Sequence, residues 1–249
     1  MHIDTNLGIF MPSYEKTFLR IELREGFKKL EKLLKKAIHN YCSEHGLAYQ
    51  DFVFPDDGSL IVIDRQIIAK ARGDDEIARS KDVLYAPRVD VAIAPFNLQP
   101  GTARYMAKIC EYIERSDGMR MWLDFLKERY YENLRRVLGN FVAPESASIM
   151  DVELLSKRNP RCFVAVEVCF GGSRKHTLGS LVNASLLGYY GVVVTGDSIP
   201  RKKVITVESV IRLKYYLMLM QKFKAVGEIG RNTIIVSRDQ FLESFKFIN

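Results

Sequence analysis

The sequence lacks the features that mark membrane-spanning, disulfide-bonded and repetitive proteins. No apolar run approaches the ~20 residues of a membrane helix; the longest, Leu186–Val194, is interrupted by glycine. The four cysteines, Cys42, Cys110, Cys162 and Cys169, form no Cys-x-x-Cys pair and no metal pattern with histidine. There is no internal repeat and no recognisable signal peptide, so we expect a reducing cytoplasmic location and no membrane partner.

Several catalytic and nucleotide-binding motifs are absent as well. The chain has no Gly-x-Ser-x-Gly elbow, which argues against a serine hydrolase of that type. It has no dinucleotide fingerprint. Its glycine-rich loop at 171–176 lacks the Walker spacing between glycine and lysine, which argues against a nucleotide-binding P-loop.

The composition is that of an ordinary globular protein with a basic surplus. The 249 residues are 47% hydrophobic and 27% charged, and a chain of this length buries roughly 70–75% of its unfolded surface without disulfides or metals. We expect a single domain over residues 1–249. The net charge of +7 weakly favours a polyanionic partner such as nucleic acid.

Two long segments carry helical periodicity. In residues 14–45, apolar residues recur every three or four positions, and several lysines lie away from that stripe, where a solvated face is the simpler interpretation. Residues 102–139 look helical in two pieces, divided near 116–118, and we expect 101–150 to be a helical insertion in the domain. Between these segments, residues 51–63 are predicted to form a hairpin around Pro55–Gly58.

Short apolar runs predict strands in the rest of the chain. Residues 88–96, 162–170, 190–195 and 233–237 are predicted strands, with helices over 174–187, from 206 to about 225, and over 238–247. Strands that alternate with helices through the last ninety or so residues indicate an α/β fold with parallel crossovers. The run at 162–170 is apolar almost throughout, so it is expected at the centre of the sheet.

Two acidic residues interrupt these apolar strands. Glu167 lies in the middle of the most apolar strand, where a lone carboxylate must be neutralised, paired or bound to a metal. The alternative is a structural carboxylate bonded to a buried arginine or to backbone amides. Asp90 lies near the start of the strand at 88–96. Two carboxylates brought together without clustered Cys or His suit Mg²⁺ or Mn²⁺ better than Zn²⁺.

The loop after the central strand carries cationic and amide donors. Ser173 is a good helix N-cap, and the exposed amides at a helix start attract phosphate. Arg174, Lys175 and His176 follow directly, beside Glu167 in sequence. A plain glycine turn with solvated charges is the alternative interpretation of this loop.

The order of these elements resembles the PD-(D/E)xK nuclease superfamily, which has a restriction-endonuclease-like fold. The resemblance is carried by Pro87-Arg88-Val89-Asp90 and by the segment from Ala165 to His176, and it covers residues 15–196. It implies an α/β fold with a mixed central sheet flanked by helices. It also implies that Asp90 and Glu167 bind Mg²⁺, with Asp151 as the rival first acid.

The resemblance breaks at one position. The family places a lysine two residues after the second acid, and here that residue is Cys169. Some members recruit a lysine from the following helix, which would be Lys175. The distance in sequence between Asp90 and Glu167 is also long for the family, and the helical segment at 102–139 would account for it.

These observations predict a Mg²⁺-dependent endonuclease that hydrolyses phosphodiester bonds of DNA. Asp90, Glu167 and Lys175 would be catalytic, while Ser173, Arg174 and His176 would bind the nucleic acid. Enzymes that cut both strands are often dimers, so a homodimer is one candidate assembly. The second hypothesis is a non-catalytic nucleic-acid-binding or assembly module on the same fold, and the third is an enzyme that binds a phosphate ligand at the loop 171–176.

Overall fold

A computed structural model describes most of the chain. The described residues are 14–66, 88–99, 101–139, 160–197, 199, 203–219 and 232–248. The polar segment at 65–83 is predicted to be helix or loop; its first two residues instead end a strand, and the rest lies outside the described residues. The rival acid Asp151 also lies outside them, as does the part of the helix predicted from 206 that follows residue 219.

The described strands form one mixed sheet in the order β1-β2-β3-β4-β5. Their bounds are Ile61–Gln66 for β1, Arg88–Phe96 for β2, Cys162–Cys169 for β3, Gly188–Thr195 for β4 and Thr233–Ser237 for β5. The first three strands pair antiparallel, and the last three pair parallel. This confirms the predicted α/β class, with β3 central and its residues buried throughout.

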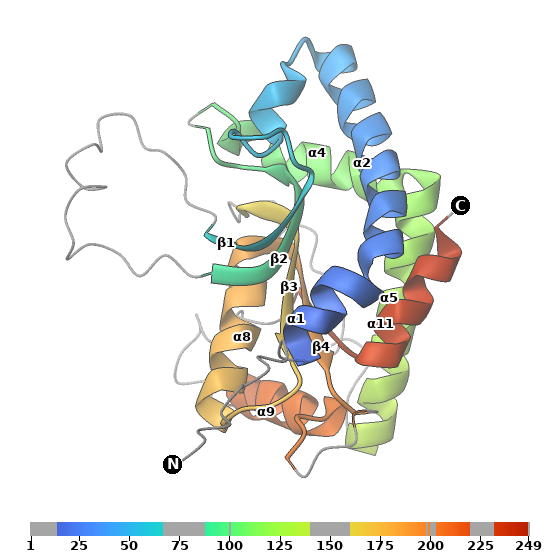
Figure 1. Ribbon diagram of the computed structural model, residues 1–249, viewed down its shortest axis with the longest axis vertical. Helices are drawn as coiled ribbons and strands as arrows, with labels where there is room; N and C mark the ends of the chain where they lie inside the picture. The colour runs from blue at the N-terminus through green and yellow to red at the C-terminus, as the bar shows by residue number, and fades with distance from the viewer. Residues whose placement is uncertain are drawn as a thin grey trace, which may run out of the picture.

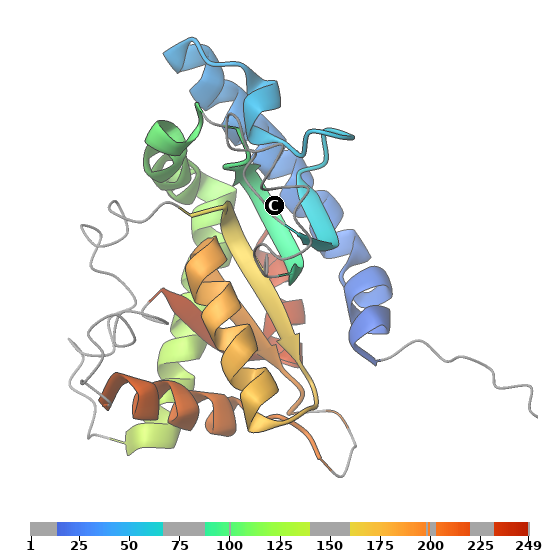
Figure 2. The same cartoon turned by 90° about the vertical axis from the view of Figure 1, so that its left-hand side faces the viewer.

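Helices cover both faces of the sheet. They are α1 (Tyr14–Thr17), a π-helical turn (Phe18–Glu22), α2 (Arg24–His45), α4 (Ala103–Arg115), α5 (Asp117–Leu138), α8 (Arg174–Leu187), α9 (Val207–Leu219) and α11 (Arg238–Ser244), with 3-10 turns at Tyr49–Phe52 and Phe245–Phe247. Helix α8 lies on one face of the sheet, whereas α2, α5 and α11 lie on the other (Figures 1 and 2). None of the helices in the described ranges is long and apolar enough to span a membrane.

The predicted boundaries hold well where turn chemistry is clear. The break in the helical segment at 102–139 falls at Ser116, between α4 and α5. Helix α8 begins after Ser173, whose side chain accepts a hydrogen bond from the backbone amide of His176 at 3.3 Å. The predicted N-cap is therefore confirmed.

The hairpin predicted at 51–63 is wrong in its first half. Residues Tyr49–Phe52 form a 3-10 turn, and only the second half becomes a strand, β1. Within the turn, the amide of Phe54 donates to the carbonyl of Ser59, and the amide of Gly58 donates to the carbonyl of Phe54. Phe52 and Phe54 are buried, so this apolar run packs into the core without pairing as a strand.

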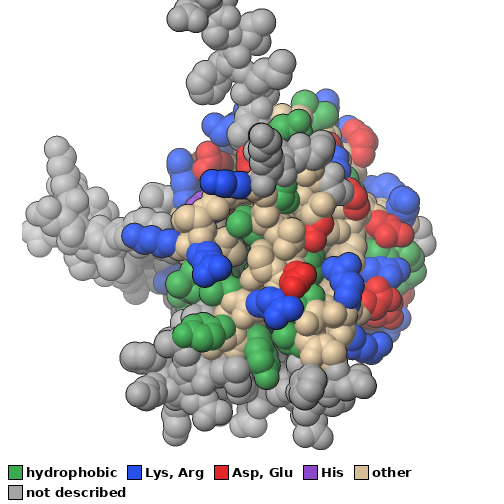
Figure 3. Space-filling model, turned by 90° about the horizontal axis from the view of Figure 1, so that it is seen from below, with side chains coloured by type: hydrophobic (Ala, Val, Ile, Leu, Met, Phe, Trp, Pro, Cys, Tyr) green, Lys and Arg blue, Asp and Glu red, His purple; other side chains and the backbone are tan. Residues whose placement is uncertain are grey.

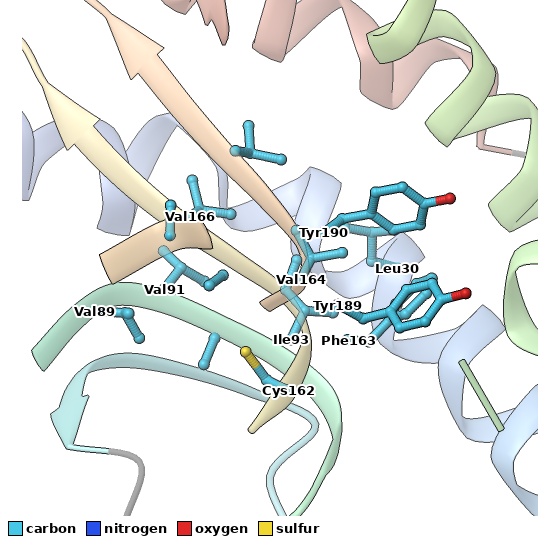
Figure 4. Close-up of a cluster of buried hydrophobic side chains, with 14 of the residues drawn as sticks. Leu30, Val89, Val91, Ile93, Cys162, Phe163, Val164, Val166, Tyr189 and Tyr190 are labelled. Atoms are coloured by element: carbon cyan, nitrogen blue, oxygen red, sulfur yellow. The ribbon is translucent and has the colours of Figure 1, made fainter. Parts of the chain in front are cut away.

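The core on the α2 side of the sheet is built by alternate residues of neighbouring strands. Val91 and Ile93 of β2 pair with Val166 and Val164 of β3, and Figure 4 shows them clustered with Leu30 of α2. All five side chains are fully buried. Because side chains alternate along a strand, the residues between them face α8 instead.

The contact between α8 and β4 gives a test of this packing. A Cβ on Gly191 would lie 2.8 Å from the backbone carbonyl carbon and oxygen of Ala184, which cannot move aside independently of α8. We expect Gly191→Ala to destabilise the fold by about 1–3 kcal/mol. Gly179→Ala, within α8 and with open space around its Cβ, should stabilise by up to about 1 kcal/mol. Urea unfolding of both variants measures this, and equal effects would contradict the packing described here.

Candidate functional site

The sheet register places three acidic residues side by side. Val91 pairs with Val166, which brings Asp90 opposite Glu167 across β2 and β3. Ile63 and Arg65 pair with Val91 and Val89, which brings Asp64 opposite Asp90 across β1 and β2. Side chains directly opposite one another in an antiparallel pair have Cβ atoms about 4.5–5.5 Å apart. The register therefore concentrates negative charge at one level of the sheet.

Glu167 is the most constrained of the three. Its side chain is 5% exposed, and its Oε1 atom is buried without a hydrogen-bond partner in the described part of the chain. The pKa of Glu167 is raised to about 9, first by burial and then by the charge of Asp90, while hydrogen bonds from Asn183 and Ser180 on α8 oppose the shift. No arginine or lysine in the described part of the chain forms an ion pair with Glu167. This argues against the alternative in which Glu167 serves only to pair with a buried arginine.

Asp90 is held by the backbone of β3. Its Oδ2 atom accepts a hydrogen bond from the amide of Val168 at 2.7 Å. Burial raises the pKa of Asp90, and the Val168 amide opposes that shift; among nearby charges, Asp64 raises the pKa and His176 lowers it. Asp90 is therefore oriented beside Glu167 by a bond to the residue that follows Glu167.

Asp64 differs from Asp90 and Glu167 in its backbone conformation and in its exposure. It has a positive φ of 52°, a conformation that residues other than glycine rarely adopt. Its Oδ1 atom lies 3.4 Å from Nε of Arg88, and both side chains are more than half exposed. Asp64 therefore lies at the rim of the acidic row.

The acids open into a cleft of about 750 Å³ between α1, the first strands and α8. Its walls carry basic side chains from four separate elements, namely Lys16 of α1, Arg20 of the π-helical turn, Arg88 of β2, and Lys175 and His176 of α8. Glu15 and Asp64 add acidic groups near the rim. The cleft thus has an acidic floor, formed by the buried Glu167 and the partly buried Asp90, and a largely basic wall.

Helix α8 contributes a polar stripe to the cleft. Ser173, His176, Ser180 and Asn183 follow one another at spacings of three and four, so they share one side of the helix. This stripe faces Glu167, whose pKa responds to Ser180 and Asn183. An apolar strand and a polar helix stripe therefore enclose the buried carboxylate.

Most of the predicted site residues meet in this cleft. Asp90, Glu167, Ser173, Lys175 and His176 all line it. The Lys175 amine forms no ion pair with a described acid, whereas the charge of His176 acts on Asp90.

Arg174 faces away from the cleft, into a separate groove between α8 and α9. The residues of the predicted phosphate-binding loop therefore line two different surfaces. This is expected because neighbouring residues of a helix point in different directions.

Cys169 occupies the position that the resemblance reserves for lysine. It is fully buried on the same side of β3 as Glu167, and burial raises the pKa of its thiol to about 12. A thiol with such a pKa is protonated at neutral pH and is a poor nucleophile. Cys169 therefore acts as a small apolar residue beside the site.

Sequence reasoning missed several residues of the cleft. Asp64 directly follows the apolar run of β1, so it could have been recognised only with the strand register. Glu15, Lys16 and Arg20 lie in the first turns of the helical segment predicted at 14–45, and nothing local in the sequence predicts that these turns border the cleft. Ser180 and Asn183 had a detectable signal, because they extend the spacing of Ser173 and His176 along the predicted helix.

The donors of the cleft are consistent with a hard divalent cation. Two adjacent carboxylates, one with an unpartnered oxygen, are oxygen ligands of the kind that Mg²⁺ or Mn²⁺ prefers. A cation would also relieve the repulsion between the two charges. Within the described residues, no group of three Cys, His, Asp or Glu side chains is placed to hold a metal. The candidate protein ligands in this part of the chain are therefore the two carboxylates of Asp90 and Glu167.

Comparison with protein-family models, with curated proteins and with solved structures found no match to this chain.

The pKa of Glu167 predicts how stability depends on pH. Because the folded pKa is raised to about 9 from 4.5, the folded state binds the proton more tightly, and this contribution to stability is lost as pH rises through that window. We expect Glu167→Gln to remove a slope of at most about 1.4 kcal/mol per pH unit.

Denaturant unfolding of both proteins from pH 5 to 9, in the presence of a chelator, measures this effect. Burial lowers the pKa of Lys214 to about 7 and produces the opposite dependence, so the informative quantity is the difference between wild type and variant. A difference that does not change with pH would show that Glu167 titrates normally.

Proposed function

We propose that this protein is a metal-dependent nuclease that hydrolyses phosphodiester bonds of DNA, on a restriction-endonuclease-like variant of its α/β fold. The observation that supports it most directly is the position of Asp90 opposite Glu167, with Glu167 Oε1 buried and unpartnered at the floor of the cleft. A mixed sheet with the two acids on adjacent strands and a helix following the second acid agrees with the resemblance noted from the sequence.

The charges of the cleft suit a phosphodiester substrate. Its cationic wall includes Lys16, Arg20 and Arg88 as well as Lys175 and His176. A polyanion would be attracted to the wall, while the acidic floor would repel it unless a cation were bound there. The arrangement therefore favours a phosphate ligand together with a divalent cation.

Each residue of the cleft has a distinct role in this proposal. Asp90 and Glu167 would hold Mg²⁺, which when bound stabilises charge on the phosphate and activates water. Lys175 neutralises the attacked phosphate. The amides at the start of α8, which Ser173 caps, and the ring of His176 position the neighbouring backbone.

The second candidate function is a non-catalytic nucleic-acid-binding module. Two observations favour it: Cys169 replaces the usual lysine, and Lys175 lines the cleft without an ion pair to either acid. Such a module would keep the cationic wall but would not cleave the substrate.

The carboxylate pair predicts metal binding coupled to proton release. Titration with Mn²⁺ by calorimetry should show binding that Glu167→Ala abolishes and Asp90→Asn weakens at least about tenfold. Since the pKa of Glu167 is about 9, binding at pH 7 should release close to one proton, measured by comparing buffers of different ionisation enthalpy.

The matched control is Asp117→Asn. Asp117 is an almost fully exposed acid on α5, away from the cleft, and its substitution should leave Mn²⁺ affinity unchanged. Equal Mn²⁺ binding by wild type and Glu167→Ala would remove the basis for the nuclease proposal.

Lys175 separates the nuclease from the binding module. If Lys175 stabilises the reacting phosphate, Lys175→Ala should lower the Mg²⁺-dependent cleavage rate about 10²–10³-fold, while DNA affinity falls less than about tenfold because one phosphate contact among many contributes little. Lys108→Ala, which removes a lysine lining a different cavity, is the control.

Two further measurements extend this test. Cys169→Lys in the Lys175→Ala background should restore part of the cleavage, because position 169 lies on the same side of β3 as Glu167 and a long lysine stem can reach out of the core toward the cleft. Wild-type protein that binds DNA or RNA but cleaves neither with Mg²⁺ nor with Mn²⁺ would instead support the binding module.

A further inference from the structure

A second groove adjoins the cleft at the first turn of α8. It has a volume of about 620 Å³ and lies between α8 and α9. Arg174 and Thr177 of α8 line it, whereas Ser173 and His176, on the other side of the same turn, line the cleft. The two concave surfaces are therefore separated only by the width of one helix, about 10 Å with side chains.

The groove combines an exposed aromatic ring with apolar walls. Tyr216 of α9 is 60% exposed, and it lines the groove together with Leu213 and Ile205. An exposed tyrosine ring beside aliphatic side chains offers a flat apolar surface, and such a surface stacks well against the face of a nucleobase.

Two arginines border this surface. Arg174 forms no ion pair with a described residue, and Arg212 pairs with Glu208 at 2.9 Å. Both members of that pair are more than half exposed, so it contributes little stability and can be exchanged for a phosphate contact. Figure 3, which views the end of the molecule where α8 begins, shows hydrophobic and Lys or Arg side chains next to one another.

We propose that this groove binds a base of a single-stranded nucleic acid whose backbone crosses the first turn of α8 into the cleft. The inference rests on the proposed function and names its substrate class. Tyr216 would stack on the base, while Arg174 and Arg212 would contact the flanking phosphates. A base inside a duplex has both faces covered by its neighbours, so a stacking surface of this kind selects an unpaired strand.

The direct test is binding with catalysis switched off. Fluorescence anisotropy in a chelating buffer compares a labelled single strand of about 15 nucleotides with the duplex of the same sequence. Wild type should bind the single strand more tightly, and Tyr216→Ala should weaken that binding about 5- to 100-fold. Tyr216→Phe retains the ring and should remain within about twofold of wild type.

Two further variants complete the design. Leu186→Ala removes an exposed apolar side chain at the far end of α8 and should leave affinity unchanged. Arg212→Ala should reduce the dependence of log affinity on log salt by about 0.7, the value for one phosphate contact on a single strand. Thermal unfolding of each variant confirms that the fold is intact.

The outcomes distinguish this inference from the proposed nuclease activity. Tyr216-dependent binding of the single strand, without cleavage by wild type in Mg²⁺ or Mn²⁺, would support the groove and overturn the nuclease. Cleavage with an affinity unchanged in Tyr216→Ala, or with duplex bound as tightly as the single strand, would overturn the groove alone. If wild type binds neither form, the groove proposal is wrong.

Discussion

The site depends on one electrostatic constraint, the burial of the Glu167 carboxylate in the most apolar strand of the sheet. A buried charge without a partner is strongly unfavourable, and the fold answers it with a raised pKa rather than with an ion pair. Asp90, directly opposite, is a further acidic group that raises the pKa of Glu167, where a cation would have compensated its charge. A core selected for stability alone would place an apolar residue here, so the pair is the part of the molecule that most requires a functional explanation.

Much of the fold could be predicted because strand and helix boundaries coincide with strong local signals. Helix α8 and strand β5 begin and end where the sequence predicts, since Ser173 is an N-cap and Ser237 caps the next helix. Residues 51–54 were predicted wrongly because a short apolar run can be buried either as a strand or as a packed turn. The packing of the π-helical turn after α1 against the end of β3 could not be predicted, because it depends on tertiary contacts such as the one between Phe18 and Phe170.

The part of the candidate site that could be predicted is the part formed by acidic residues within apolar strands. Asp90 and Glu167 stand out because they are acids in apolar strands, and the sheet register then brings them together. Asp64 could not be recognised from the sequence, since its place beside Asp90 follows from the pairing of β1 with β2. The division of the 171–176 loop between two surfaces follows from helical geometry, which sends Arg174 to one side and Ser173 and His176 to the other.

The replacement of lysine by Cys169 has a consistent physical reason in this structure. Position 169 is fully enclosed, and the pKa of its thiol is raised by burial, so a lysine there would have to reach out of the core to keep its charge solvated. The cationic groups have instead been placed on the wall of the cleft, on α1, β2 and the first turn of α8. Glu167 is thus buried and Asp90 partly buried, whereas the cations stand on solvent-facing side chains that can adjust to a phosphate backbone. This separation suits a surface that must hold a small cation tightly and a long polyanion more loosely.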